Sequence, residues 1–460
     1  MSALEQKVKS GHTSDILLQI SEQMPSAFAA LARKHQVPGA QFAIYRGGLT
    51  VTDEIGELEF GTGLRVTRDA VFPIGSITKF FTATVAMILV ADGDADLDAP
   101  IRDYVPEMGN LGAMISLRQL LSHTSGLAES SGMGEESSSS LRHYIVDHIC
   151  GSNLVLPPGT GFSYSNPGYI VAGRLIETVT GMSWSEAVES ILLRPLGIEP
   201  TFVNPPETIP PRHQVATGHS VNTAVGRIRP VRQELAPAFA PVGALAVSAV
   251  DLVKLGLIHV GPGRPDVLPV AYAGQMRKAV PRADPFGLAD GWGPGLAVYW
   301  HRPAVWVGHD GNANGTSCYV RINPADGWVV ALTSNSNTGV GLWQEFRAEL
   351  ARAGVPINLP RVPGGPRVAP PRDCAGQYTN GDIQCTVKAD SNGAVYLSAD
   401  GQNFVLLNFY ENIFTFSASD MTSLGQASTG RFVRDSATGK IYGMHVSGRL
   451  ARRRQQVVSV

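Results

Sequence analysis

The sequence has little cysteine, no marked excess of one charge and no long apolar run. Its four cysteines form no Cys-x-x-Cys pair, which argues against a zinc cluster and against a redox motif. The formal net charge of -2 gives no basic footprint for nucleic acid and no cationic surface suited to anionic membranes. We therefore expect neither a metal nor another cofactor, and neither a nucleic-acid nor a membrane partner.

The amino-terminal residues also lack the unbroken apolar core of a signal peptide, because charged side chains interrupt them from Glu5 onward. The longest apolar run, Ala83 to Ala91, is too short to span a bilayer and indicates one buried helix. We expect a cytoplasmic protein without a membrane anchor. In that compartment Cys374 and Cys385, which could pair, are expected to remain free thiols.

The order of apolar runs predicts an α+β catalytic domain. The segment Gly39 to Asp53 contains two β-rich runs around Arg46-Gly47-Gly48, a hairpin signal. Three more β-rich runs come late in the chain, and helical spacing of apolar residues lies between the two groups. The late runs span residues 305–308, 316–322 and 328–333, and the helical stretches span 80–92, 168–180 and 248–260. We expect one antiparallel sheet built from both ends of the domain and flanked by helices, with a helical subdomain inserted.

A proline-rich segment predicts where this domain ends. Six prolines fall between residues 356 and 371, a composition that excludes a helix or a central strand and is typical of a linker. The remaining residues alternate polar and apolar side chains in short runs, which predicts a small all-β barrel. The predicted organisation is an amino-terminal extension (1–30), a catalytic domain (31–355) with a loop at Gly132 to Ser140, a linker (356–371) and the β domain (372–460).

The candidate chemistry centres on Ser76 and Lys79, which open the apolar helix. A spacing of three residues places both side chains on the same face of its first turn. A serine hydroxyl needs an adjacent base, and a desolvated lysine can serve as one. A free lysine has a pKa of about 10.4. For Lys79 to act as a base at neutral pH, its pKa must lie about three below that value, which corresponds to roughly 4 kcal/mol in favour of the neutral amine. The spacing alone is a weak pattern, so other motifs must support it.

Two later motifs carry further polar groups. Tyr164 and Asn166 lie two residues apart before a predicted helix, where Tyr164 can relay a proton and Asn166 can orient a substrate amide. At residues 308–312, the sequence Gly-His-Asp-Gly-Asn places His309 and Asp310 between glycines, which lets a substrate backbone approach closely. Taken separately, an ordinary loop tyrosine and a simple turn would explain these residues.

Together the motifs resemble those of β-lactamase-like, penicillin-recognising serine enzymes. Ser76-x-x-Lys79, Tyr164-x-Asn166 and His309-Asp310-Gly311 occur in the order of the family's three motifs, in the branch that has Tyr-x-Asn. Three further stretches resemble the family: Leu120 to Leu127, Pro158 to Asn166, and Gly243 to Leu252. The resemblance covers roughly residues 30 to 350 and implies a β-lactamase/transpeptidase-like fold. It also implies that His123, in the first stretch, is a structural histidine beneath the site.

The resemblance implies a covalent mechanism. Ser76 attacks an acyl carbonyl while Lys79 takes its proton, and the backbone amides of Ser76 and Asn312 hold the developing oxyanion. Tyr164, near the ammonium of Lys79, protonates the leaving group and later deprotonates the incoming one, so the two residues titrate as a coupled pair. The sequence leaves open which of them is the base.

Other residues are assigned to the substrate. His309 is expected to support Tyr164 electrostatically and to assist proton transfer. Beside Gly311 and Asn312, Asp310 either meets a substrate amine or simply caps the turn. In the basic tail, Arg449 or Arg452 lines the cleft and holds a peptide carboxylate by a bidentate pair, unless the tail is a solvated end.

One departure from the family pattern bears on the substrate. Many relatives have Lys-Thr-Gly where this chain has His309-Asp310-Gly311, and the loss of a permanent cation argues against β-lactam hydrolysis. The chain resembles most the cytosolic penicillin-binding-protein-type thioesterases, which carry a lipocalin-like β domain and cyclise nonribosomal peptides, usually at a D-residue. The expected partner is then a peptidyl carrier protein or a carrier-bound peptide thioester. An intracellular D-amino-acid peptidase, amidase or esterase is the alternative, and a non-catalytic penicillin-binding sensor is a more remote one.

Overall fold

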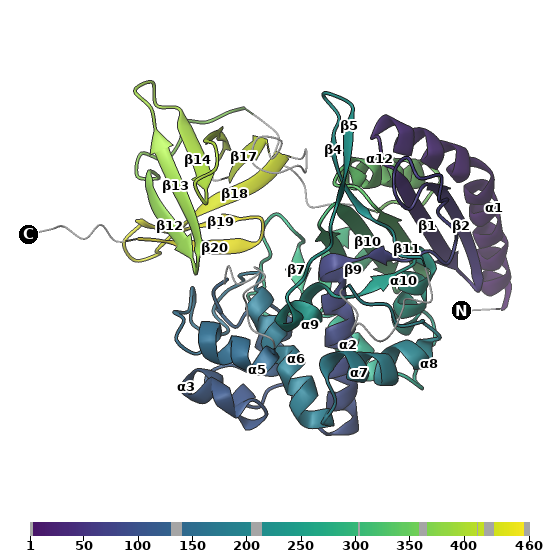
Figure 1. Cartoon of the computed structure of the whole chain (residues 1–460), viewed down its shortest axis with the longest axis horizontal. Helices are drawn as coiled ribbons and strands as arrows, with labels where there is room; N and C mark the ends of the chain where they lie inside the picture. Colours follow the sequence, from purple (N-terminus) through teal and green to yellow (C-terminus); the bar gives the residue numbers. More distant parts are fainter. Residues whose placement is uncertain are drawn as a thin grey trace, which may run out of the picture.

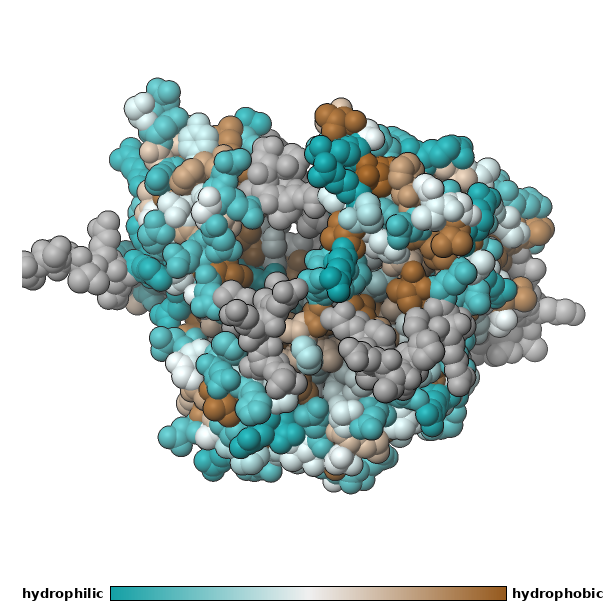
Figure 2. Space-filling model, in the orientation of Figure 1, coloured by the Kyte–Doolittle hydropathy of each residue, from teal (hydrophilic) through white to brown (hydrophobic). Residues whose placement is uncertain are grey.

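The computed structural model describes residues 3–129, 140–203, 214–301, 304–357, 366–411, 413–417 and 427–454. A larger body of sheet and helices lies beside a smaller all-β body, and the amino terminus lies at the far edge of the larger one (Figure 1). The face shown in Figure 2 is mostly hydrophilic, with scattered apolar residues. Residues 358–365 of the predicted linker lie outside the described part of the chain, as does most of the loop predicted at Gly132 to Ser140.

The larger body is built on a seven-stranded antiparallel sheet of order β2-β1-β11-β10-β9-β8-β7. Its strands are β1 (Gly39–Arg46), β2 (Leu49–Gly56), β7 (Gly291–Trp292), β8 (Ala297–His301), β9 (Ala304–Ala313), β10 (Thr316–Asn323) and β11 (Trp328–Ser334). The first two form the predicted hairpin, whose turn residues Gly47 and Gly48 have φ of 58° and 88°, values that suit glycine. Strand β1 then pairs with β11 from the end of the domain. The prediction of an α+β fold with one antiparallel sheet from both ends is confirmed.

Helices cover both faces of this sheet, and side chains alternate between two cores. On β1, Phe42 packs with α1 (Ala3–Lys34) and α12 (Gly339–Arg352), whereas its neighbour Ala43 faces the helices on the other side. In the first core Phe28 of α1 lies edge-on against Phe42 at a ring-centroid distance of 5.0 Å. The boundary predicted at residue 30 therefore falls inside α1, because this helix completes one core of the sheet.

The other face carries the helical subdomain. The predicted helices appear as α2 (Thr78–Asp92), α6 (Asn166–Thr180) and α10 (Ala249–Gly256), the last followed by a 3-10 turn at Leu257–His259. Shorter helices surround them: α3 (Gly109–Gly112), α4 (Leu117–Leu121), α5 (Leu141–Tyr144), α7 (Trp184–Val188), α8 (Arg194–Leu196), α9 (Ala240–Gly243) and α11 (Val270–Met276). By length and apolarity the stretch Gly75–Asp92 could span a membrane, but 78% of it is buried inside this body, as is usual for the central helix of a folded domain.

The smaller body is a nine-stranded antiparallel sheet of order β15-β14-β13-β12-β20-β19-β18-β17-β16 that curls into a nearly closed barrel. Its strands are β12 (Gly376–Asn380), β13 (Ile383–Ala389), β14 (Val395–Ala399), β15 (Val405–Leu406), β16 (Asn408–Tyr410), β17 (Ile413–Ser417), β18 (Ala427–Arg434), β19 (Ile441–Val446) and β20 (Arg449–Arg453). Cys374 and Cys385 lie in its apolar core as free thiols, as predicted. The prediction of a carboxy-terminal all-β barrel is confirmed.

Candidate active site

The candidate nucleophile Ser76 lies in a 3-10 turn, Gly75–Ile77, that leads directly into α2. Its Oγ lies 2.9 Å from Nζ of Lys79, which also lies 3.4 Å from the carbonyl oxygen of Val242. Lys79 is fully buried, whereas Ser76 is partly exposed. The structure therefore brings the predicted pair into direct contact at the start of a buried helix.

Two glycines allow strand β9 to approach this turn. A Cβ atom at Gly311 would collide with the carbonyl oxygen of Ile74, and one at Gly75, where φ is 49°, would collide with the carbonyl oxygen of Asn312. The pairing of β9 with β8 ends at Gly308, so the segment that follows lies against the start of the helix instead. Asn312 thus lies beside the turn that carries the serine, and its role as an oxyanion donor stays a prediction.

Burial disfavours the charged form of Lys79. Removal from water lowers its pKa well below the usual value of 10.5; the carboxylate of Glu129 opposes this effect, and the guanidinium of Arg449 adds to it. The rings of Tyr164 and Tyr169 lie with their centroids 5.1 and 5.9 Å from Nζ and help to exclude water. The lowered pKa makes this amine a better candidate acceptor for the proton of the serine hydroxyl than a solvent-exposed lysine would be.

Tyr164 is the second member of the candidate proton-transfer pair. Its ring stacks on His123 at a centroid distance of 4.2 Å, and Cζ of Arg449 lies 5.0 Å from the ring centroid. Burial raises the pKa of Tyr164 to about 12, and a hydrogen bond with Ser76 opposes this increase. The phenol is therefore protonated at neutral pH, which favours Lys79 as the resting proton acceptor and Tyr164 as the donor.

Two buried histidines lie beside Tyr164, and both are neutral. The backbone N of Ser165 donates to Nδ1 of His123 at 3.1 Å, in keeping with a structural histidine. Nδ1 of His309 donates to the carbonyl oxygen of Asp310 at 2.6 Å, and burial, together with repulsion by nearby positive charge, lowers the pKa of His309 to about 4. At neutral pH this imidazole gives Tyr164 no cationic support. Its Nε2 is buried without a hydrogen-bond partner among the described residues and remains an acceptor.

Asp310 points to the opposite face of β9 from His309, because neighbouring residues of a strand alternate. Its carboxylate forms an ion pair with Arg321, a fully buried guanidinium that lies 4.3 Å from the ring centroid of Tyr299. Removing the partner of a buried charge is costly. The Asp310 carboxylate is thus already occupied within the protein, and the contact with a substrate amine that the sequence suggested would have to compete with this ion pair.

Glu129, which the sequence analysis missed, links the motifs to the barrel. This carboxylate is 6% exposed and accepts hydrogen bonds from the backbone N and Nδ2 of Asn166 at 3.1 and 3.3 Å. It also accepts from Nε of Arg449 at 3.2 Å, which brings into the site one of the two arginines proposed to line the cleft. Glu129 belongs to no motif, and no sequence spacing connects it with an arginine near the end of the chain.

Turns of the barrel contact the segment that carries Tyr164. In the turn between β19 and β20, the carbonyl oxygen of Gly448 accepts a hydrogen bond from the backbone N of Tyr164 at 2.8 Å. The neighbouring Ser163 Oγ accepts from the backbone N of Leu450 at 3.2 Å and from Nδ2 of Asn380 at 3.3 Å. Both bodies therefore build the candidate site, and the barrel is hydrogen-bonded to the backbone of Tyr164 and to the side chain of Ser163.

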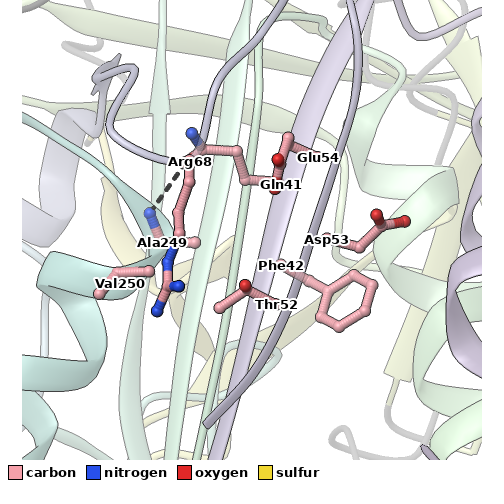
Figure 3. Close-up of a pocket in the computed structure, with 8 residues that line it drawn as sticks. All are labelled: Gln41, Phe42, Thr52, Asp53, Glu54, Arg68, Ala249 and Val250. Atoms are coloured by element: carbon pink, nitrogen blue, oxygen red, sulfur yellow. Dashed lines mark hydrogen bonds between the residues drawn. The ribbon is translucent and has the colours of Figure 1, made fainter. Parts of the chain in front are cut away.

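A hollow at the β2 edge of the sheet, beside the start of α10, shares no residue with this site (Figure 3). It lies along β1 and β2, and Oε1 of Gln41 accepts a hydrogen bond there from the backbone N of Ala249 at 3.1 Å. Nε2 of Gln41 donates to the carbonyl oxygen of Ala70 at 3.0 Å. The Gln41 amide therefore links strand β1 both to Ala70 and, through the bond from Ala249, to the start of α10. Within the described ranges, no group of three or more His, Cys, Asp or Glu side chains is placed to hold a metal ion.

Fold and site together define a serine acyl-transfer enzyme. The buried Lys79 contacts Ser76 at the start of the central helix α2, and Gly311 allows strand β9 to approach the turn that carries the serine. Residues 24–353 match the family model described as Beta-lactamase, and the chain belongs to this family of serine hydrolases and acyltransferases.

Individual relatives show how far the similarity extends. The chain is 33% identical over 365 residues to penicillin-binding protein 4 of Amycolatopsis lactamdurans, a match that covers 76% of this chain and 95% of that protein. The crystal structure of SurE is 36% identical with a TM-score of 0.84, covering 95% of this chain and all of that one; SurE has also been crystallised with D-Leu. The D-amino acid amidase of Ochrobactrum anthropi, solved with D-phenylalanine, is 25% identical with a TM-score of 0.61 and covers 71% of this chain and 98% of its own. Similarity to SurE therefore includes the barrel, whereas similarity to the amidase extends about as far as the catalytic body.

Proposed function

We propose that this protein is a stand-alone thioesterase that releases a peptide from a carrier-bound thioester in the cytoplasm and closes it into a ring through a Ser76 acyl-enzyme. The observation that carries the proposal is the site built by two bodies, in which Arg449 of the barrel lies against Tyr164 and pairs with Glu129. The barrel distinguishes this chain from relatives that match only its catalytic body. The similarity to SurE covers 95% of this chain and therefore includes the barrel.

The first half of the proposed reaction forms the acyl-enzyme. Lys79 accepts the proton of the Ser76 hydroxyl as Oγ attacks the thioester carbonyl, and the start of α2 provides a positive dipole near the developing oxyanion. The carbon–sulfur bond then breaks. Tyr164 donates a proton to the leaving thiolate and is reprotonated by the Lys79 ammonium, so that no net charge remains in the buried site.

The second half returns the enzyme to its starting state. The amino end of the peptide attacks the acyl carbonyl, its proton passes through Tyr164 and Lys79 to Ser76 Oγ, and a peptide bond replaces the ester. Because the ion pair of Arg449 with Glu129 uses Nε, the terminal nitrogens of Arg449 are available, among the described residues, for peptide carbonyl or carboxylate oxygens. Holding the chain beside the acyl group raises the effective concentration of its amine over that of water.

A D-residue at the acylating end is part of the proposal. SurE was crystallised with D-Leu, and the related amidase with D-phenylalanine. The alternative activity, hydrolysis of D-amino-acid amides or small esters, is supported by the likeness of the catalytic body to that amidase. The two activities differ in whether amine or water resolves the same acyl-enzyme.

The test is a side-by-side assay of carrier-mimic thioesters of one linear peptide that differ only in the configuration of the terminal residue. The D-terminal thioester should have the higher kcat/KM by at least about tenfold, the lower end of the discrimination that a single methylene produces in a hydrophobic pocket. Mass spectrometry should identify mostly cyclic product. Ser76→Ala is the control and should abolish both turnover and the acyl adduct.

Other outcomes would decide against the proposal in defined ways. Release of linear acid alone would establish a hydrolase. Cleavage of D-amino-acid amides or short-chain esters, with thioesters ignored, would establish the alternative activity and leave only the Ser76 chemistry. Full activity of the Ser76→Ala variant would overturn the covalent mechanism itself.

A further inference from the structure

A two-stranded arm extends from the catalytic body on the side that faces the barrel (Figure 1). It consists of β4 (Gly218–Asn222) and β5 (Arg227–Val231), paired antiparallel. An isolated two-stranded hairpin is only marginally stable. This one is fixed at its base, where Val221 backbone N donates to Oδ1 of Asn337 at 2.8 Å and His219 backbone N donates to the carbonyl oxygen of Gly315 at 2.9 Å.

The arm carries an uncompensated positive charge. Arg227 and Arg229 are both exposed and lie on one face of the ribbon, because they are two residues apart on a strand. The residues opposite them in β4 are Asn222 and Ser220, so no carboxylate faces them across the ribbon. Within the described part of the chain neither arginine forms an ion pair. In a protein of net charge -2, the arm is therefore a local cationic surface.

An apolar tip adjoins these arginines. Val225, in the turn between the two strands, is 68% exposed. The space-filling view shows the same pattern, with hydrophilic residues along the arm and an apolar end (Figure 2). Apolar contact bordered by arginine is the usual composition of a small protein interface.

The base of the arm contacts the strand that enters the active site. Nε2 of Gln233 hydrogen-bonds to the carbonyl oxygen of Asn314, and Nδ2 of Asn314 donates to the carbonyl oxygen of Arg232 at 3.4 Å. Asn314 lies only two residues beyond Asn312, beside the serine turn. A partner bound to the arm is therefore held next to the candidate site and not at a remote surface.

We propose that the β4–β5 arm is the docking surface for an acidic carrier protein that presents its peptide as a thioester. This inference rests on the thioesterase function proposed above. The arginines pair with carboxylates of the carrier and steer its approach, while the apolar tip contacts the carrier's surface near the attached thioester arm. The carrier then delivers its acyl group along β9 toward Ser76.

The test compares two double charge reversals. Arg227→Glu/Arg229→Glu alters the arm, and Arg102→Glu/Arg142→Glu reverses two other exposed arginines in the helical subdomain as a matched control. Each is assayed on a peptide loaded through phosphopantetheine onto a peptidyl carrier domain, and on the same peptide as a small-molecule thioester. The arm variant should lose about 10- to 100-fold in kcat/KM on the carrier substrate, with a weaker salt dependence, and keep its activity on the small thioester within about twofold.

The outcomes separate this inference from the proposed function. Unchanged kinetics on the carrier substrate, or equal losses for arm and control variants, would overturn the docking surface alone, while turnover of the small thioester would still support the thioesterase. If the wild-type enzyme uses neither thioester, the proposed function fails and the docking surface with it. If the arm variant loses a binding to phosphatidylglycerol vesicles that the wild-type enzyme has, while its kinetics on the carrier substrate are unchanged, the arm contacts a membrane surface and the docking proposal is wrong.

Discussion

Replacing Gly381 by alanine should separate the barrel from the catalytic site. This glycine lies in the turn between β12 and β13, has φ of 56°, and a Cβ atom there would collide with the carbonyl oxygen of Glu129. Gly393, in the next turn of the barrel, has φ of 81° and nothing within 4 Å of the same atom. Gly393→Ala is therefore a matched control that introduces the same kind of backbone strain without the clash.

The magnitude follows from the contacts that the clash disturbs. Both variants carry a left-handed alanine, which costs about 1–2 kcal/mol. Gly381→Ala in addition forces apart the hydrogen bonds of Glu129 N with Oδ1 of Asn380 at 2.8 Å and of Asp382 N with the Glu129 carbonyl oxygen at 3.3 Å. With about 1 kcal/mol for each bond and about 1–3 kcal/mol for overpacking, docking should weaken by roughly 3–5 kcal/mol, or about 150- to 4,000-fold.

Amide hydrogen exchange and kinetics together provide the assay. The backbone N of Tyr164 donates to the carbonyl oxygen of Gly448, so release of the barrel should speed its exchange in Gly381→Ala but not in Gly393→Ala. kcat/KM on the peptidyl thioester should fall at least about tenfold relative to the control, because Arg449 leaves Tyr164. If the two variants match in exchange and in kcat/KM, the barrel does not shape the site through Glu129 and the reasoning is refuted.

Two further predictions concern the catalytic body. Lys79→Ala and Tyr164→Phe should lower kcat/KM by similar factors, and the double variant by little more than either, because the residues act as one unit; losses that multiply in a double-mutant cycle would assign them separate roles. The pKa of His309 is about 4 in the folded protein against 6.5 when unfolded, so the unfolded state binds more protons between these values and the free energy of unfolding falls as pH drops through this window. His309→Gln should therefore reduce the stability lost between pH 7 and pH 5 by about 2 kcal/mol, as measured by chemical unfolding, and an unchanged pH dependence would contradict the assigned charge state.

Local sequence signals predicted most of the fold. The hairpin at Gly47 and Gly48 depends on backbone conformations that glycine adopts freely. The apolar residues of α6 recur with helical spacing, whereas α2 is apolar along most of its length because nearly all of it is buried. The contact of Ser76 with Lys79 also follows from helical geometry alone, since residues three apart share a face. These features need only neighbouring residues, which is why the sequence was sufficient for them.

The tertiary structure alone decided the charges and partners of the site. Glu129 meets Arg449 only because two bodies far apart in the chain pack together, and Asp310 meets Arg321 only because β9 and β10 align in one register. The neutral state of His309 and the lowered pKa of Lys79 come from loss of contact with water, which depends on every element that covers them. The sequence by itself determined which groups are available for chemistry; packing between distant segments determined which of them are paired, which are charged, and which face a substrate.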